Sequence, residues 1–312
     1  MKTIRFHTYG EPAEVLRLEE ADIPNPLPGH LRVKVHACGL NPADWALCRG
    51  LFPGELPRGV GLDVAGIVDA LGEGVTGAAV GDRVYGPGNF AAYPSAGASD
   101  FAILDRWALV PEGLDLTQAA AMPMAVETAY LHVEALDPKP GQTLMVHGAG
   151  TMMGYAAVQI GLLRGAKVIA TAGETFAGRL RALGATVTPY GEGMVERVRE
   201  IADGAPDLIL DASRPNGVIP DLIAIAGGDA RRVMTMTDFA SAAELGARYS
   251  FGETLVRRED AFARFAQLAT EGRFEIPIAR TYPLDGWREA LEASLGGHAH
   301  GKHILLPGGT RA

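Results

Sequence analysis

The sequence predicts an α/β protein in which a mostly-β domain is combined with a doubly wound parallel sheet. Short β-like runs separated by Gly and Pro fill the first 121 residues, and strand-like and helix-like patterns alternate after them. Residues 143–173 read as strand, glycine turn, helix and strand, which is a βαβ unit. A chain of 312 residues with 47% apolar content can bury the two cores that this division requires.

The first domain is predicted from β-like runs with turn signals between them. Strands are expected at 31–36, 64–68, 83–85 and 101–104. The segments Pro26-Leu27-Pro28-Gly29 and Gly81-Asp82 have the composition of turns. This pattern is typical of a compact, mostly antiparallel, barrel-like domain.

The second domain begins with a helix, predicted over 124–136, that ends before Pro138. After the βαβ unit, strands are expected at 186–188, 208–211 and 232–237, with helices at 195–202 and 218–226 between them. Such alternation builds a doubly wound parallel sheet. The tail is predicted as helix at 260–271, extended chain at 276–284, amphipathic helix at 287–295 and strand at 304–306, and it could return to the first domain.

The glycine turn of the βαβ unit indicates a nucleotide site. Gly148, Gly150 and Gly154 separate an apolar strand from a helical pattern. A pyrophosphate binds at a helix amino end only where the backbone can come close, and glycine permits that approach. The spacing is one residue longer than the usual fingerprint, so a tight turn of another α/β domain is the alternative. The βαβ context favours a dinucleotide site.

The end of the second strand of this unit indicates which dinucleotide binds. NAD-binding proteins place Asp or Glu about 20 residues after the first glycine. Here that place reads Ala170-Thr171-Ala172, so no carboxylate repels a 2′-phosphate and NADP is favoured. We expect Thr171 at the cofactor, and Arg179 and Tyr190 are candidates to bind the 2′-phosphate. The alternative for Arg179 is an ordinary solvated helix residue.

Composition narrows the class of protein further. The formal net charge of −9 and the absence of a dense Lys/Arg run argue against a nucleic-acid partner. No segment has the length of a signal peptide core or a membrane span, so we expect a cytoplasmic protein without a membrane partner. Cys38 and Cys48 are too few for a disulfide framework or a four-cysteine zinc lobe. His298, His300 and His303 are expected at the surface.

Short segments along the chain occur in the order and spacing of a known family. They are 39–44 (GLNPAD), 57–68 (PRGVGLDVAGIV), 81–84 (GDRV), 119–123 (AAAMP), 128–130 (TAY), 140–143 (PGQT), 146–149 (VHGA) and 301–305 (GKHIL). Through them the chain resembles the zinc-free quinone oxidoreductase branch of the medium-chain dehydrogenase/reductase family over nearly its whole length.

The resemblance implies a GroES-like catalytic domain formed by residues 1–121 and 274–312 and an NAD(P)-binding Rossmann domain at 122–273. We also expect a homodimer. Zinc-dependent relatives carry a ligand cysteine at the position of Asn41, and Gly-His-Glu at the position of Gly61-Leu62-Asp63. These replacements remove the ligands that zinc prefers, so no metal site is expected. Cys38 lies beside the ligand position and is interpreted as a small buried residue.

The resemblance also assigns site residues. It places Asn41 and Thr128 near the nicotinamide, and the Asn41 amide offers donors and an acceptor to cofactor or substrate. The alternative for Asn41 is a turn-forming residue before Pro42. In the phosphate loop, Thr151, Met152 and Met153 stand in a segment where relatives carry more glycines, and they are expected to contact the cofactor.

A second departure concerns the segment after Asp44. Relatives often carry tyrosines there, whereas this chain has Trp45 and the pair Leu51-Phe52, so a more apolar pocket wall is expected.

The sequence therefore predicts an NADPH-dependent, zinc-independent reductase of a quinone or another conjugated carbonyl, a small-molecule enone. An alkenal or enoyl reductase of the same family remains the alternative within the enzyme class. A non-catalytic nucleotide-binding sensor or structural protein is the alternative outside it. No single acid is expected to be indispensable, and Asp44, Tyr93, Tyr130 and His132 are the remaining candidates for a proton donor.

Overall fold

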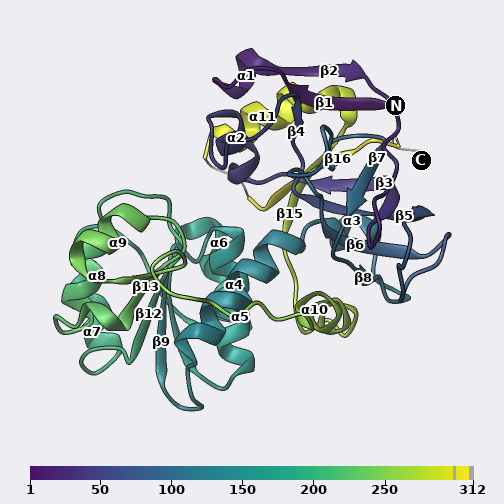
Figure 1. Cartoon of the computed structure of the whole chain (residues 1–312). Coiled ribbons are helices and arrows are strands. Elements are labelled where there is room, and N and C mark those ends of the chain that lie inside the picture. The colour runs from purple at the N-terminus through teal and green to yellow at the C-terminus, as the bar shows by residue number, and fades with distance from the viewer. Residues whose placement is uncertain (298–299, 309–312) are drawn as a thin grey trace. The chain divides into compact units, whose positions relative to one another are not determined.

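A computed structural model describes residues 1–297 and 300–308 (Figure 1). The chain divides into two compact units. The terminal unit contains residues 1–124 and the described residues from 262 onward, and the central unit contains residues 125–261. The chain passes from one unit to the other within helix α4 (Pro123–Leu136) and again at the start of helix α10 (Ala261–Thr270). Helix α10 therefore falls almost wholly in the terminal unit, whereas the predicted border at 273/274 assigned it to the nucleotide-binding domain.

The central unit is a parallel sheet covered by helices. Its strands are β9 (Thr143–His147), β10 (Lys167–Thr171), β11 (Thr186–Thr188), β12 (Leu208–Asp211), β13 (Val233–Thr235) and β14 (Arg248–Tyr249). Its helices after α4 are α5 (Met152–Leu163), α6 (Glu174–Leu183), α7 (Met194–Ile201), α8 (Ile219–Ile225) and α9 (Phe239–Leu245). Among the described residues the strand order is β11-β10-β9-β12-β13-β14, with every pair parallel.

This strand order confirms the predicted doubly wound sheet. The order reverses at β9, because the chain runs outward from β9 to β11 and then returns to β12 on the other side. Figure 1 shows α5 and α6 on one side of the sheet and α7, α8 and α9 on the other. In a sheet of this kind, ligands bind beyond the carboxyl ends of the strands at the reversal, which here lies between β9 and β12.

Burial explains why the strands of this sheet are continuous apolar runs. Both faces of a parallel sheet are covered by helices, so the inner strands β9, β12 and β13 are mostly apolar. Met145 of β9, Ile209 of β12 and Val233 of β13 are fully buried. They form one core cluster with Leu222 of α8.

The terminal unit consists of mostly antiparallel β-structure closed by the C-terminal segment, whose strands β15 and β16 pair in parallel. Its elements are β1 (Lys2–Phe6), α1 (Pro12–Val15), β2 (Leu16–Glu20), β3 (Leu31–Gly39), α2 (Pro42–Cys48), β4 (Arg58–Gly59), β5 (Asp63–Leu71), β6 (Arg83–Pro87), β7 (Phe101–Leu104), β8 (Ala108–Leu109), α3 (Leu116–Ala120), β15 (Ile278–Pro283), α11 (Trp287–Leu295) and β16 (Lys302–Leu306). Short 3-10 turns occur at Ala230–Arg232 of the central unit and at Leu284–Gly286 of the terminal unit.

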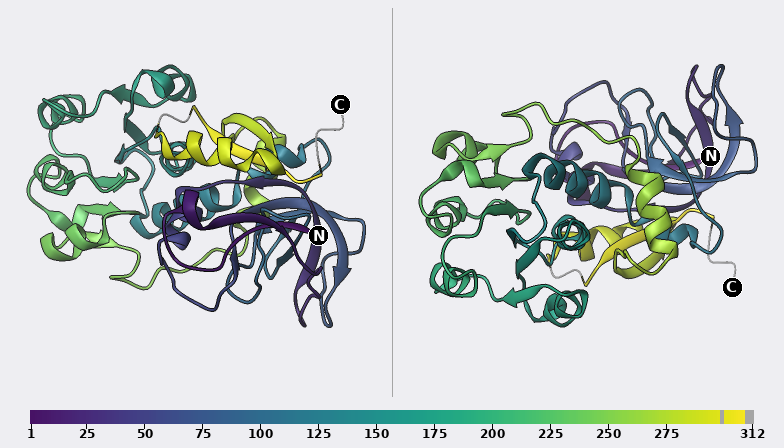
Figure 2. Two further views of the ribbon diagram at one scale, coloured as in Figure 1. Left: turned by 90° about the horizontal axis from the view of Figure 1, so that it is seen from above. Right: turned by 90° about the horizontal axis from the view of Figure 1, so that it is seen from below.

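The C-terminal segment returns to the N-terminal strands. Strand β16 pairs antiparallel with β3, with Leu305 opposite Cys38 and Ile304 opposite Gly39. Figure 2 shows this yellow segment beside the purple and blue strands of the same unit. The return sets Lys302, the first residue of β16, beside the carboxyl end of β3 and the start of α2.

Candidate functional site

The turn after β9 is shaped by two glycines that the chain's own packing requires. Gly148 has φ +73°, and a Cβ at this position would lie 2.5 Å from the backbone nitrogen of Ser213, which follows β12. A Cβ on Gly154 would lie 2.3 Å from the carbonyl oxygen of Gly148. No side chain fits at either position without displacing backbone. Because the turn follows β9 and approaches Ser213 after β12, it lies at the reversal of the strand order, where a doubly wound sheet binds its ligand.

Gly150 differs from the other two glycines. A Cβ there would lie 3.4 Å from Cδ2 of Phe176, which is close to ordinary contact. The fold alone therefore does not require glycine at this position. A ligand backbone or phosphate that approaches the turn closely would require it, because a side chain would occupy that space.

Helix α5 begins at this turn with a side-chain cap. The Thr151 hydroxyl accepts a hydrogen bond from the Gly154 amide at 3.0 Å and lies 3.0 Å from the carbonyl oxygen of Gly148. Met152 and Met153 form the first turn of the helix, where backbone amides have no intrahelical acceptor, and both are half-buried. Such amides and the positive end of the helix dipole can bind a phosphate group.

The end of β10 supports the same turn. Thr171 is fully buried, and its hydroxyl contacts Nδ1 of His147 at 2.8 Å and accepts from the Gly148 amide at 3.3 Å. Burial lowers the pKa of His147, with Asp211 partly opposing that shift. The Thr171 side chain therefore holds the glycine turn in place from within the protein.

The two residues predicted at a 2′-phosphate, Arg179 and Tyr190, are both exposed. The ring of Tyr190 is exposed and lies beside Gly173, since a Cβ on Gly173 would be 3.7 Å from the tyrosine hydroxyl. Arg197 holds the loop that carries Tyr190 by donating to the carbonyl oxygens of Pro189 and Glu192. Arg179 is exposed on α6. Both assignments stay predictions.

Sequence reasoning did not consider one carboxylate near this place. Glu174 is the first residue of α6, three positions after Thr171, and it is exposed. The end of β10 is therefore less free of negative charge than the Ala170-Thr171-Ala172 segment indicates.

A buried polar cluster occupies the terminal unit where α2, β5 and β16 meet. We call Asn41, Asp44, Asp63 and Lys302 the Asn41 cluster. These side chains are 5%, 0%, 1% and 3% exposed, respectively. The Lys302 ammonium donates to Oδ1 of Asn41 at 2.5 Å and to Oδ2 of Asp63 at 2.6 Å. The cluster is thus built around a buried ion pair.

The same contacts fix the Asn41 carboxamide. Its Nδ2 donates to Oδ2 of Asp63 at 3.0 Å and lies 3.5 Å from the carbonyl oxygen of Gly39. The amide of Met124, in the first turn of α4, donates to Oδ1 of Asp63 at 2.8 Å. A reversed Asn41 amide would set its NH₂ against the ammonium and its oxygen against the carboxylate. Its orientation is therefore determined by Lys302 and Asp63.

Asp44 anchors the backbone around the cluster. Its carboxylate accepts from the Asn41 amide at 2.7 Å, the Gly61 amide at 2.6 Å and the Leu62 amide at 3.0 Å. The first of these bonds is one half of a capping box at the start of α2, which the spacing Asn41-Pro42-Ala43-Asp44 encodes. Burial raises the pKa of Asp44 to about 7, although the Gly61 and Asn41 amides favour the charged form.

Sequence reasoning listed Gly301-Lys302 as a family segment but gave Lys302 and Asp63 no role. A signal was present, because each is a charged residue at the start of a mostly apolar strand, Lys302-His303-Ile304-Leu305-Leu306 and Asp63-Val64-Ala65-Gly66-Ile67-Val68. A fully buried charge needs a partner of opposite charge, so a charged residue at such a position predicts a buried ion pair.

The other candidate proton donors have partners inside their own units. The Tyr93 hydroxyl accepts from the Leu27 amide at 3.0 Å and contacts Nδ1 of His30. His132 contacts the Thr128 carbonyl oxygen at 2.7 Å and the Ser250 hydroxyl at 2.6 Å, and burial lowers its pKa. Thr128 itself is half-buried on α4.

Tyr130 is 2% exposed, and its ring lies under Arg258, whose guanidinium carbon is 5.9 Å from the ring centroid. It is therefore a core residue of the central unit.

Two expectations about side-chain position need adjustment. His303 is not a surface residue: it is 8% exposed, and its Nδ1 lies 3.2 Å from the Tyr282 hydroxyl. Its ring packs against that of Tyr282, with the ring centroids 5.7 Å apart. His300 is exposed, and His298 lies outside the described residues.

Trp45 is buried with its Nε1 donating to the Ser294 hydroxyl, so it packs in the core and is not part of an open pocket wall.

Leu51 and Phe52, in contrast, are 40% and 53% exposed, so this pair remains available as an apolar pocket wall.

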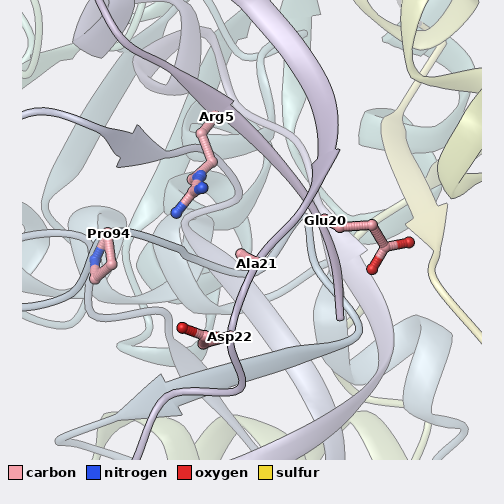
Figure 3. A pocket seen from close by; sticks show the side chains of 5 residues that line it. All are labelled: Arg5, Glu20, Ala21, Asp22 and Pro94. Atoms are coloured by element: carbon pink, nitrogen blue, oxygen red, sulfur yellow. The ribbon is translucent and has the colours of Figure 1, made fainter.

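The described cavities lie away from these groups. One of about 500 Å³ is lined by Arg5, Glu20, Ala21, Asp22 and Pro94, and Figure 3 shows Arg5, Asp22 and Pro94 bordering it while the Glu20 side chain points away. Another, of about 480 Å³, lies at the amino ends of β9, β10 and β11. The predicted site residues in the described part of the chain line neither cavity. The candidate site is therefore identified from the glycine turn and the Asn41 cluster, and not from a cavity.

Comparisons with known proteins agree with this architecture. Residues 27–113 match the alcohol dehydrogenase GroES-like domain, and residues 183–305 match the zinc-binding dehydrogenase family. The quinone oxidoreductase of Pseudomonas aeruginosa is 30% identical over 334 aligned positions, which cover 98% of this chain and 99% of that protein. That of Sus scrofa is 38% identical over 179 positions, and this match spans about half of its length, 53%.

Solved structures show the same fold. The Escherichia coli quinone oxidoreductase complexed with NADPH aligns with a TM-score of 0.82 at 25% identity, covering 98% of this chain and 100% of that one. The quinone oxidoreductase of Coxiella burnetii aligns with a TM-score of 0.83 at 25% identity, covering 98% and 99%. The terminal unit is thus GroES-like and the central unit Rossmann-like.

The full-length relative, the two family matches and the strand order therefore identify this chain as an oxidoreductase of the medium-chain dehydrogenase/reductase family, in its quinone oxidoreductase branch.

Proposed function

We propose that this oxidoreductase uses NADPH to reduce a quinone or another conjugated carbonyl without zinc. The observation that carries the proposal is the Lys302 ammonium between Asn41 and Asp63. By the family resemblance, Asn41, Leu62 and Asp63 occupy positions at which zinc-dependent relatives have metal ligands. An amide oxygen and one carboxylate are a poor donor set for zinc, which prefers Cys and His, and the ammonium beside them has no lone pair for a metal.

Within 1–297 and 300–308, no three His, Cys, Asp or Glu residues lie close enough to share a metal ion. We therefore expect full activity in the presence of a chelator. A stoichiometric zinc ion in the purified protein, with activity lost on its removal, contradicts this part of the proposal.

The central unit fits a nicotinamide dinucleotide. Gly148 and Gly154 form a turn with no room for a side chain, and the amides of Met152 and Met153 begin α5 beside it. We propose that these groups hold the pyrophosphate, and that Tyr190 with Arg179 binds the 2′-phosphate. The cofactor supplies the hydride, and the protein residues supply binding and orientation.

Asn41 is the residue we propose to act on the substrate. The charge that develops on a conjugated carbonyl after hydride addition spreads through the molecule, so a neutral hydrogen-bond donor can stabilise it. We expect Asn41→Ala to lower kcat/KM by about 10- to 100-fold, roughly 1.4 to 2.7 kcal/mol of transition-state stabilisation. The exposed apolar pair Leu51 and Phe52 is consistent with an aromatic or apolar substrate.

The test is NADPH oxidation, followed by its absorbance, with matched panels of quinones, alkenals and enoyl thioesters. Quinone-dependent turnover supports the proposal, and turnover with alkenals or enoyl thioesters alone replaces it with the alkenal or enoyl reductase. If NADPH binds and no panel member is reduced, a non-catalytic nucleotide sensor becomes the better description.

We also propose a homodimer in the cytoplasm. Strand β14 ends the described parallel sheet, and Phe251 beyond it is 66% exposed, so this edge can extend into a second copy. Cys38 and Cys48 are free and buried, as a reducing compartment allows. No helix in the described residues is both long and apolar enough to cross a membrane. Light scattering coupled to gel filtration gives the oligomeric state.

A further inference from the structure

We propose that Lys302 is a positioning residue that orients and polarises the Asn41 carboxamide, so that Asn41 acts as a hydrogen-bond donor to the substrate oxygen. The inference rests on the proposed reduction of a carbonyl compound. It assigns Lys302, which lies 261 positions from Asn41 in the sequence, a role in that reaction.

The hydrogen-bond inventory of Asn41 gives the first step. An amide side chain has two N–H donors and one oxygen with two lone pairs. The oxygen accepts from Lys302 at 2.5 Å, and one N–H is held by Asp63 at 3.0 Å. The other faces the Gly39 carbonyl oxygen at 3.5 Å, the limit of a hydrogen bond. This weakly held N–H is the group that a substrate oxygen can take over.

Polarisation gives the second step. An ammonium on the oxygen of an amide draws electron density toward that oxygen, which makes the N–H groups better donors. The effect is large in a site without water, and the Asn41, Asp63 and Lys302 side chains are at most 5% exposed. A polarised N–H stabilises a developing oxyanion more than a ground-state carbonyl, so the interaction raises kcat.

Close packing shows that the ammonium has little freedom to move. A Cβ on Gly39 would lie 2.9 Å from Cε of Lys302 and 2.3 Å from the Ala120 carbonyl oxygen. The lysine stem thus runs through a space that only glycine leaves open. Lys302→Met is the informative replacement, because methionine keeps a stem of similar length and removes the charge.

Kinetics provide the functional test, in the full-length protein with the best panel substrate. Lys302→Met should lower kcat by about 10-fold or more with KM for NADPH unchanged. In an Asn41→Ala background the same change should cost less than about 3-fold, because Lys302 acts through Asn41. The inference is overturned if Lys302→Met lowers kcat by the same factor in the wild-type protein and in the Asn41→Ala variant. It is also overturned if Lys302→Met leaves kcat unchanged. Lys139→Met, at an exposed lysine paired with Asp137, is the matched control.

A spectroscopic test is independent of activity. The chain has four asparagines, Asn25, Asn41, Asn89 and Asn216, so selective ¹⁵N-asparagine labelling gives few side-chain signals, and Asn41→Ala assigns the one of interest. Lys302→Met should shift the Asn41 NH₂ pair and speed its hydrogen exchange by at least about 10-fold, leaving the other three unchanged. Unchanged Asn41 signals overturn the inference.

Two outcomes separate this inference from the proposed function. If the wild-type protein reduces no panel compound, the proposed function fails and the Asn41 signals alone decide the contact with Lys302. If Lys302→Met does not fold, Lys302→Met with Asp63→Asn removes the stranded carboxylate, and the same kinetic and spectroscopic changes are expected. A double variant with wild-type kcat contradicts the role of Lys302.

Discussion

The buried ion pair of Lys302 and Asp63 gives the most specific stability prediction. Lys302→Met removes an ammonium 2.6 Å from a carboxylate, in a place where both side chains are at most 3% exposed. Asp63 then keeps the Met124 amide and the Asn41 NH₂ as partners but loses its counter-charge. Breaking a buried pair on one side costs more than removing the whole pair, since it leaves an uncompensated charge.

The magnitude follows from two bounds. At an effective dielectric constant of about 20, unit charges separated by 2.6 Å attract by roughly 6 kcal/mol. The second bound is the usual cost of breaking a buried pair by removing one partner, about 3 to 5 kcal/mol. We therefore expect Lys302→Met to lower the free energy of unfolding by about 3 to 4 kcal/mol at pH 7.

Tryptophan fluorescence during urea unfolding isolates the relevant unit. All three tryptophans, Trp45, Trp107 and Trp287, lie in the terminal unit, so their signal reports its unfolding separately from the central unit. A matched control is Glu289→Gln, which breaks the ion pair of Arg280 and Glu289. This pair has the same 2.6 Å separation, but its side chains are 59% and 57% exposed. Exposed pairs of this kind contribute at most about 1 kcal/mol.

The neutral double variant completes the test. Lys302→Met combined with Asp63→Asn removes both charges and should recover most of the lost stability. A Lys302→Met loss no larger than that of Glu289→Gln, or a double variant as unstable as Lys302→Met, refutes the buried-pair reasoning.

Other predictions follow from the glycine turn, the cofactor and Asp44. Gly154→Ala should destabilise the central unit by about 1 to 3 kcal/mol, because its Cβ meets the Gly148 carbonyl oxygen at 2.3 Å. Gly150→Ala should change stability by less than about 0.5 kcal/mol while weakening NADPH binding in calorimetry, and unchanged binding argues against a pyrophosphate at this turn. NADPH should bind more tightly than NADH, and Arg179→Ala should narrow the difference in fluorescence titrations; an unchanged ratio removes Arg179 from the site. The pKa of Asp44 is raised by burial from 3.8 to about 7, so its contribution to stability is full below its unfolded value and is lost as pH rises through about 7. Urea midpoints of the terminal unit should therefore fall between about pH 4 and 7, and Asp44→Asn should flatten this fall; parallel curves contradict it.

Local patterns were sufficient for most elements of the central unit. The strand at 143–147, the helix at 152–163 and the strand at 208–211 are continuous apolar or 3.6-period runs bounded by glycine, proline or aspartate. Edge elements carry weaker signals, since β14 has two residues and α9 is half exposed, and neither was predicted. An edge strand is covered on fewer sides, so its sequence is less constrained.

The sequence by itself determined that a glycine turn joins a buried strand to a helix, because chain geometry and burial act there over a few residues. Tertiary structure alone decided what the charged residues do. Lys302 meets Asn41 and Asp63 across 261 and 239 positions of sequence, and only the pairing of β16 with β3 brings them together. A charge in an apolar strand is unfavourable until its partner is known, and local sequence contains no information about a partner so far along the chain.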